Sequence, residues 1–241
     1  MGQQVAVMLE ADIRRKSVQT RSAERVVLAG LRFKLNQGEI VALVGPSGCG
    51  KSTTLRLVGG LDTAFEGQLV WAGGQRPRIG TVFQEPRLLP WRTVRQNIEL
   101  VRPPDSASVD GLLGALDLTS SSDAYPPTLS LGMARRAAIA RAFAIDPELM
   151  LLDEPFVSLD AATAEQGRQV LLDIWRRRPT TAILVTHDMP EAAALADRIL
   201  VMTAAPALIR HDINVPREAR RRGIAYGAEV AEDLISRFRD S

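Results

Sequence analysis

The sequence predicts an α/β fold with a mostly parallel sheet, an N-terminal antiparallel β subdomain and an inserted α-helical subdomain. In the first 36 residues apolar and polar positions alternate, which is typical of strands with one face in water. Four later runs are short and apolar throughout, as in parallel strands that are covered on both faces. Residues from about 86 to 148 have a helical composition interrupted by proline and glycine, which indicates the helical insertion.

The elements of this fold follow in order along the chain. The N-terminal alternation predicts antiparallel strands, and its apolar positions are Val5, Val7, Leu9, Val27, Leu31, Phe33 and Leu35. The predicted parallel strands are IVALV (40–44), LMLL (149–152), AILV (182–185) and ILVM (199–202). The helical insertion contains SVDGLLGALDL and the alanine-rich ARRAAIARAFA. We expect a single domain over 1–241, with a core formed by 1–85 and 149–241 around the insertion at 86–148.

Composition excludes several classes of protein. With 241 residues and 46% hydrophobic content, the chain can bury a sizeable core. The net charge of +2 is too balanced for nonspecific nucleic-acid binding, so no nucleic-acid partner is expected. A single cysteine, Cys49, excludes an intramolecular disulfide and fits a reducing compartment. No leader and no apolar run of roughly 18 to 20 residues is evident, so a membrane role requires partner subunits.

A glycine-rich segment follows the first apolar run. GPSGCGKST has the full P-loop spacing, in which glycines let backbone N–H groups surround a phosphate at the start of a helix. Lys51 adds a positive charge for the β- and γ-phosphates, and the Ser52 hydroxyl can bind Mg²⁺. A glycine-rich turn with this spacing by chance is the alternative. The predicted phosphate-binding residues are Gly45, Pro46, Ser47, Gly48, Cys49, Gly50, Lys51, Ser52 and Thr53.

Two carboxylates follow the second apolar run, in LMLLDEP. Ligands of open α/β sheets gather at the carboxyl ends of strands, where Asp153 and Glu154 are expected. Asp153 would hold Mg²⁺, a hard cation that prefers oxygen ligands. Glu154 could accept a proton from an attacking water. Acids at the start of an ordinary loop are the alternative.

Two further predicted strands end at polar residues. IGTVF runs into Gln84, and AILVT runs into His187. A lone histidine is more often structural than catalytic, but the position of His187 directly after a buried strand favours a function. His211 has no such setting and is interpreted as structural.

Taken together, these residues closely resemble the ATP-binding cassette (ABC) ATPases. LSLGM, residues 129–133, is similar to the signature motif of that family, and SLD at 158–160 resembles its D-loop. The likeness extends from about residue 24 to 203 and has every motif in the family's order. It implies a P-loop NTPase fold with a RecA-like core, and ATP with Mg²⁺ as ligands.

The resemblance also implies the roles of the site residues. Two cassettes meet head to tail, here as a homodimer, so that Ser130 and Gly132 of one subunit hold the γ-phosphate of ATP on the other. Glu154 would act as the base, with His187 and Gln84 positioning water and γ-phosphate. Gln84 would join Ser52 and Asp153 around Mg²⁺. For Ser130 alone, a helix cap beside glycine is the alternative.

Within the family, VFQEPRLLPWRTVRQNIEL resembles the ATPase subunits of bacterial importers for nitrate, sulfonates and taurine. This likeness implies transmembrane permease subunits as partners, a solute-binding protein acting through the complex, and a place at the cytoplasmic face of the inner membrane. Residues 87, 88, 89 and 91 would receive a permease helix, or alternatively Trp91 and the leucines are core. The rival functions are a non-transport ABC ATPase acting on DNA or ribosomes, and a P-loop small-molecule kinase.

Three segments depart from the family pattern, and MARR, at 133–136, is the least consequential of them. Ser22 stands where many members stack adenine on an aromatic ring, which predicts weaker nucleotide affinity because such stacking is worth roughly 1 to 3 kcal/mol. Leu131 stands where glycine is usual. Leucine would be costly there if the backbone must approach the phosphate closely or take a positive φ.

Overall fold

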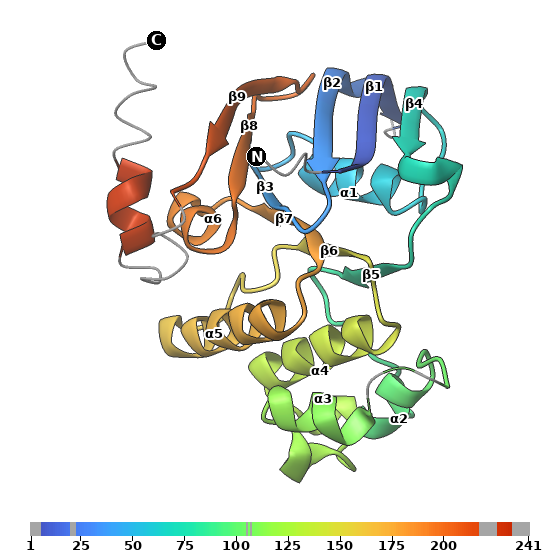
Figure 1. The fold of residues 1–241 in the computed structure, drawn as a ribbon, viewed down its shortest axis with the longest axis vertical. Helices are drawn as coiled ribbons and strands as arrows, with labels where there is room; N and C mark the ends of the chain where they lie inside the picture. Colours follow the sequence, from blue (N-terminus) through green and yellow to red (C-terminus); the bar gives the residue numbers. More distant parts are fainter. Residues whose placement is uncertain (1–5, 20–22, 105, 107, 217–225, 233–241) are drawn as a thin grey trace. The chain divides into compact units, whose positions relative to one another are not determined.

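The computed structural model describes residues 6–19, 23–104, 106, 108–216 and 226–232 (Figure 1). The chain folds into two compact units. The first unit contains Met1–Arg76 and Thr181–Ser241, and the second contains Pro77–Thr180. No helix among the described residues is long and apolar enough to cross a bilayer.

An antiparallel sheet forms one part of the first unit. Its strands lie side by side in the order β2 (Glu24–Asn36), β1 (Val7–Gln19) and β4 (Glu66–Trp71) (Figure 1). The predicted alternation is confirmed, because Leu9, Leu31, Phe33 and Leu35 are buried while Glu10, Arg32 and Lys34 are exposed. Val5 lies outside the described residues. The sequence pattern does not predict the third strand, β4.

The outer face of this antiparallel sheet is lined by cross-strand ion pairs. The Arg32 Nε lies 2.7 Å from the Asp12 Oδ1, and the Lys34 Nζ lies 2.6 Å from the Glu10 Oε1. Lys16, in contrast, is only 5% exposed and donates to Asp62 at 3.0 Å and to the Ala64 carbonyl at 2.7 Å. The hydrogen bond from Lys16 lowers the pKa of the Asp62 carboxyl from its ordinary value. This contact ties the segment before β4 to β1.

A parallel sheet forms the other part of the first unit. Strand β3 (Ile40–Val44) pairs with β7 (Thr181–Thr186) and with β8 (Arg198–Met202), both in parallel. These are three of the four predicted apolar runs, and almost all of their residues are buried. An unforeseen strand, β9 (Ile209–Asn214), adds antiparallel to β8. Helix α1 (Lys51–Val58) contacts β7, and α6 (Met189–Leu195) contacts β3, β7 and β8.

The described residues of the second unit form two strands and four helices. The parallel pair consists of β5 (Ile79–Val82) and β6 (Leu149–Asp153), the latter being the fourth predicted run. The helices are α2 (Val94–Glu99), α3 (Val109–Ala115), α4 (Leu131–Ala144) and α5 (Ala161–Arg177). Short 3₁₀ helices occur at Ala72–Gly74, in the first unit, and at Thr119–Ser121 and Pro126–Thr128 in the second.

Helix α4 is central in the second unit. It contacts α2, α3, α5 and β5, and Figure 1 shows it between α5 and α3. Its alanine side chains are small and mostly buried, so neighbouring elements approach closely. A Cβ at Gly80 of β5 would lie 2.6 Å from the Ala142 carbonyl oxygen, closer than atoms pack. The sequence ARRAAIARAFA thus forms a buried helix.

Both ends of the second unit meet one carboxylate. Arg78, directly after its first residue, donates to the Asp146 carbonyl at 3.0 Å and lies 3.5 Å from the Asp146 carboxylate. Arg178, near its last residue, forms an ion pair with the same carboxylate. The Arg78 backbone N–H also donates to Glu148 at 3.0 Å. The entering and leaving segments are therefore held together.

Candidate active site

The P-loop connects β3 to α1 in the first unit. Its two outermost glycines are both required by packing, and Gly50 is also required by its backbone conformation. A Cβ at Gly45 would lie 2.8 Å from the Met202 carbonyl oxygen at the end of β8. Gly50 has φ of 114°, and a Cβ there would lie 2.6 Å from the Leu28 side chain of β2. The residues between them, from Pro46 to Gly48, are exposed.

The charge arrangement of the loop suits an anion. Lys51 is 5% exposed, and its Nζ donates to the Gly45 carbonyl at 2.7 Å and the Pro46 carbonyl at 3.0 Å. Helix α1 has no acidic residue in its first turn, so the positive end of its dipole is not neutralised locally. Ser52, in that turn, is exposed. Cys49 is 1% exposed, so its side chain faces the protein interior.

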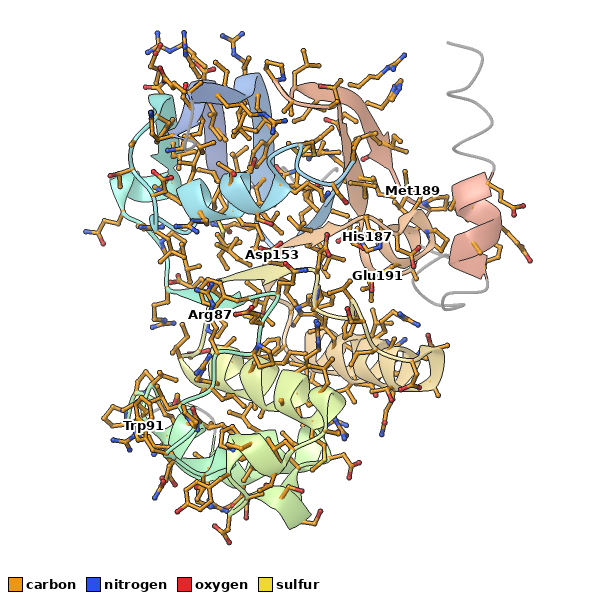
Figure 2. The ribbon with its side chains drawn as sticks, turned by 180° about the vertical axis from the view of Figure 1, so that it is seen from behind. Arg87, Trp91, Asp153, His187, Met189 and Glu191 are labelled. Carbon is orange, nitrogen blue, oxygen red and sulfur yellow. The ribbon has the colours of Figure 1, made fainter. Side chains whose placement is uncertain are left out.

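His187 lies at the same edge of the parallel sheet as the P-loop. The register pairs Val44 with Thr186, so Gly45 and His187 are the next residues of neighbouring strands. The Thr186 hydroxyl accepts from the Asp188 N–H at 3.0 Å. Asp188 in turn caps α6, and Figure 2 shows His187 exposed near Met189 and Glu191 at the start of that helix. His211 lies on β9 opposite Val201.

Gln84 and the two carboxylates share an edge in the second unit. The register pairs Val82 with Leu152, so Gln84 and Glu154 each lie two residues beyond that pair. Asp153 is the last residue of β6. Glu154 has a left-handed backbone with φ of 46°, a conformation that costs a non-glycine residue of order 1 to 3 kcal/mol. Arg135 donates to the carbonyl of Glu154 at 2.9 Å and of the next residue at 2.7 Å.

The LSLGM segment forms the start of α4. Ser130 is the N-cap, and its hydroxyl accepts from the Met133 N–H at 3.2 Å. Leu131 is 44% exposed and is the first residue of the helix, without a positive φ. Leu131 therefore does not carry the predicted cost of a positive φ. Gly132 is buried, and a Cβ would lie 2.5 Å from the Thr163 Cγ2 on α5.

The SLD segment leads into α5. Asp160 is the N-cap of this helix and accepts from the Thr163 N–H at 3.0 Å and from its hydroxyl at 2.6 Å. These hydrogen bonds, that from the hydroxyl foremost, lower the pKa of the Asp160 carboxyl. Ser158 has a left-handed backbone with φ of 62°. Thr163 thus connects the SLD segment to Gly132 of the LSLGM segment.

The loop after Gln84 is fixed by two polar side chains that sequence reasoning missed. Asn97 is fully buried, accepts from the Leu89 N–H at 2.8 Å and donates to three carbonyls of the loop. Arg141 of α4 donates to the Arg87 carbonyl at 2.7 Å and the Pro86 carbonyl at 3.0 Å. Trp91, labelled in Figure 2, is 70% exposed, so the interpretation of Trp91 as core is wrong.

The predicted site residues thus fall into two sets. The first unit contains the P-loop and His187, and the second contains Gln84, Asp153, Glu154, Ser130 and Gly132. Among the described residues, no group of three or more His, Cys, Asp or Glu side chains forms a metal site. The expected Mg²⁺ ligands, Ser52, Gln84 and Asp153, carry the oxygen donors that this hard cation prefers. Ser22 lies outside the described residues.

The comparisons with known proteins agree with the sequence resemblance. The family model described as "ABC transporter" matches residues 28–157. The aliphatic sulfonates import ATP-binding protein SsuB 2 of Burkholderia lata is 46% identical over 90% of this chain and 84% of its own. The SsuB protein of Bacillus subtilis is 43% identical over 82% of this chain and 80% of its own.

Solved structures show the same likeness. The dimeric bacterial ABC transporter cassette MJ0796 has a TM-score of 0.76 and 27% identity, covering 87% of this chain and 99% of its own. A dimeric post-hydrolysis state of the same cassette, bound to ADP and Pi, has a TM-score of 0.75. With its motifs in order and a family model that matches more than half of its length, the chain belongs to the ABC transporter family.

Proposed function

We propose that this chain is the ATPase subunit of an importer for small organic sulfonates. As a member of the family it is an ATPase, which hydrolyses ATP to ADP and phosphate. The observation that carries the solute class is the similarity to relatives named for aliphatic sulfonate import, which are 40 to 46% identical and are covered over most of their length. The PRLLPW loop after Gln84 supports the same subgroup.

In this proposal the P-loop binds the phosphates of ATP. The backbone of 45–53 and the Lys51 ammonium suit an anion, as the geometry of the loop and the helix start indicates. Ser52, Gln84 and Asp153 would hold Mg²⁺, which supplies charge neutralisation at the β- and γ-phosphates when bound. Glu154 accepts the proton of the attacking water. His187 and Gln84 orient this water and the γ-phosphate.

The second half of each site comes from another copy of the chain. We propose a head-to-tail homodimer in which Ser130 and Gly132 contact the γ-phosphate of ATP bound to the partner subunit. The exposed N-terminus of α4 supports this role, since helix starts favour anions. The MJ0796 cassette, which has a similar structure, is dimeric in both of its states described above. The whole chain acts as one cassette, with core segments 1–85 and 149–241 and the signature segment 86–148.

Permease subunits would be the other partners, placing the cassette at the cytoplasmic face of the membrane. The loop from Arg87 to Trp91 is proposed as the surface that receives a permease helix. An exposed tryptophan suits a protein interface, since aromatic residues are enriched at interface hot spots. Closure of the dimer on ATP would then move the permease, and hydrolysis would reopen it. A solute-binding protein would act through the complex.

The test of the catalytic proposal is Glu154→Gln. The amide cannot accept the proton, so we expect turnover to fall by roughly 10²- to 10⁴-fold. ATP binding, measured by isothermal titration calorimetry, should persist, and size-exclusion chromatography with ATP should show an accumulated dimer. Glu99→Gln, on the surface of α2 and 48% exposed at its side chain, is the matched control. Near-normal turnover of Glu154→Gln would remove this residue from the role of base.

The solute class requires a separate test in the source organism. A strain lacking this chain should fail to grow with an alkanesulfonate as the only sulfur source, and should grow normally with sulfate. Growth with nitrate as the only nitrogen source should be unaffected. Loss of growth on nitrate with normal growth on the sulfonate would replace sulfonates by nitrate as the cargo.

A further inference from the structure

Two loops of the second unit share an uncommon backbone feature. Glu154, after β6, and Arg87, in the loop after Gln84, both have left-handed backbones, with φ of 46° and 47°. Neither is glycine, so each conformation is strained and requires support from the surrounding structure. These two residues lie in the segments to which we assign the catalytic base and the permease contact.

The support for both loops comes from one helix. Arg135 of α4 donates to the Glu154 carbonyl at 2.9 Å and to the Pro155 carbonyl at 2.7 Å. Arg141, also on α4, donates to the Arg87 carbonyl at 2.7 Å and to the Pro86 carbonyl at 3.0 Å. In each case one guanidinium holds the carbonyl of the left-handed residue together with that of a neighbouring residue.

Burial strengthens the contacts of Arg135 in particular, whereas Arg141 is half-buried. Arg135 is 6% exposed, and burial lowers the pKa of the Arg141 guanidinium from its ordinary value. A charged group away from water is stable only when its donors are paired. Hydrogen bonds from a charged donor are also about twice as strong as neutral ones. The carbonyl contacts therefore stabilise both the arginines and the loops that they hold.

The same helix begins at the signature segment. Ser130 is its N-cap, and Arg135 and Arg141 follow on a continuous helix of 14 residues. Their separation of six residues places them about 9 Å apart along the axis and on sides that differ by about 120°. Close packing at Gly80 and Gly132 leaves little room for the helix to bend or slide. A displacement of the N-terminus of α4 is thus transmitted to both loops.

We propose that Arg135 and Arg141 are positioning residues, through which α4 links the nucleotide contact at Ser130 to the Glu154 loop and to the loop at 83–93. The inference rests on the proposed function for the roles of these segments. In a head-to-tail dimer, Ser130 contacts the nucleotide of one site while Glu154 serves the other. Arg135 therefore connects the two ATP sites, and Arg141 connects them to the permease surface.

The first test concerns Arg135. Arg135→Gln removes the charge and shortens the side chain, so the Glu154 backbone loses its support and we expect kcat to fall by about ten- to a hundredfold. The KM for ATP should change little, because the P-loop is untouched. Arg135→Lys keeps the charge and should recover part of kcat. The matched control is Arg176→Gln on α5, where the arginine is 57% exposed at its side chain.

The outcomes separate positioning from simple loss of stability. A general destabilisation would lower the unfolding midpoint while leaving kcat per folded molecule unchanged, and this result would overturn the role of Arg135. Equal kcat for Arg135→Gln and Arg176→Gln would do the same. If Glu154→Gln itself retained turnover, the proposed catalytic function would fail, independently of either arginine result.

The second test measures the loop at 83–93 by hydrogen–deuterium exchange. We expect adenylyl imidodiphosphate with Mg²⁺ to change exchange in this loop in the native protein. In Arg141→Gln, basal exchange should rise severalfold and the response to nucleotide should be lost, whereas Arg176→Gln should behave like the native protein. A full nucleotide response in Arg141→Gln would overturn the link. No response in the native protein would overturn it as well, even where calorimetry shows that nucleotide binds.

Discussion

Gly132 gives the sharpest prediction about packing. A side chain added there would clash with the Thr163 methyl group, and a second substitution at Thr163 can remove that clash. A Cβ at this position would lie 2.5 Å from the Thr163 Cγ2. Thr163 cannot simply rotate, since its hydroxyl donates to Asp160 at 2.6 Å and β-branched side chains are stiff at χ1. Gly132→Ala must therefore displace α4 from α5 or break the hydrogen bond of the SLD segment.

The magnitude follows from two opposing effects. Overpacking of this kind costs about 1 to 3 kcal/mol. Replacing glycine by alanine in a helix returns up to about 1 kcal/mol. With about 2 kcal/mol lost and about 0.75 kcal/mol gained, the middle of each range, the expected net loss in the free energy of unfolding is about 1 kcal/mol. Gly114→Ala is the control, because that glycine lies in α3 with nothing within 4 Å of its added Cβ, so it should stabilise the protein.

The assay is urea unfolding of the single variants and of Gly132→Ala combined with Thr163→Ser. Serine lacks the methyl group that clashes and keeps the hydroxyl that donates to Asp160. The double variant should recover the loss, with a coupling energy of roughly 0.5 to 3 kcal/mol. ATP hydrolysis should fall in Gly132→Ala and recover in the double variant. A Gly132→Ala protein as stable as the native one, or no recovery with serine, would refute the packing argument.

Two further predictions concern the first unit. Because the hydrogen bond from Lys16 lowers the pKa of Asp62, its stabilisation is present above the unfolded-state pKa of about 3.9 and is lost as the pH falls through the lower folded-state value. Asp62→Asn should lower the free energy of unfolding by roughly 1 to 3 kcal/mol at pH 7. The difference should shrink in urea titrations at acid pH, and a constant difference would contradict the assignment. Gly50→Ala should destabilise the protein without nucleotide by more than Gly48→Ala, since both glycines have positive φ but only Gly50 would also meet β2 side chains. Equal midpoints for these two variants would show that the contact with β2 is unimportant.

The sequence predicts the buried strands better than the edge strands. The run at 40–44 coincides with β3, and the other three apolar runs lie within β6, β7 and β8. Strands β4 and β9 are missed because their residues are half exposed and carry no apolar run. Their pairing with β1 and β8 decides their conformation, and this long-range contact has no local signal.

At the candidate site, the sequence predicts the local motifs but not the contacts between side chains and distant backbone carbonyls. The P-loop and the cap at Ser130 follow from residues close together in sequence, although their catalytic roles stay predictions. Arg135 and Arg141 contact carbonyls 19 and 54 residues away or more, so no spacing indicates them. The sequence does not predict the left-handed backbone of Glu154 either, because that conformation is usually indicated by glycine or asparagine.

The paired contacts of Asp146 with Arg78 and Arg178 hold the two ends of the second unit together. The segments that enter and leave this unit contact the same carboxylate, so its two ends lie close together. Neighbouring ends are typical of domains that can be inserted into another chain. Evolution, or an engineer, can thus exchange the piece bearing the signature helix as a whole. If the chain were cut near Arg78 and Arg178, the remaining segments would need only a short connection to rejoin.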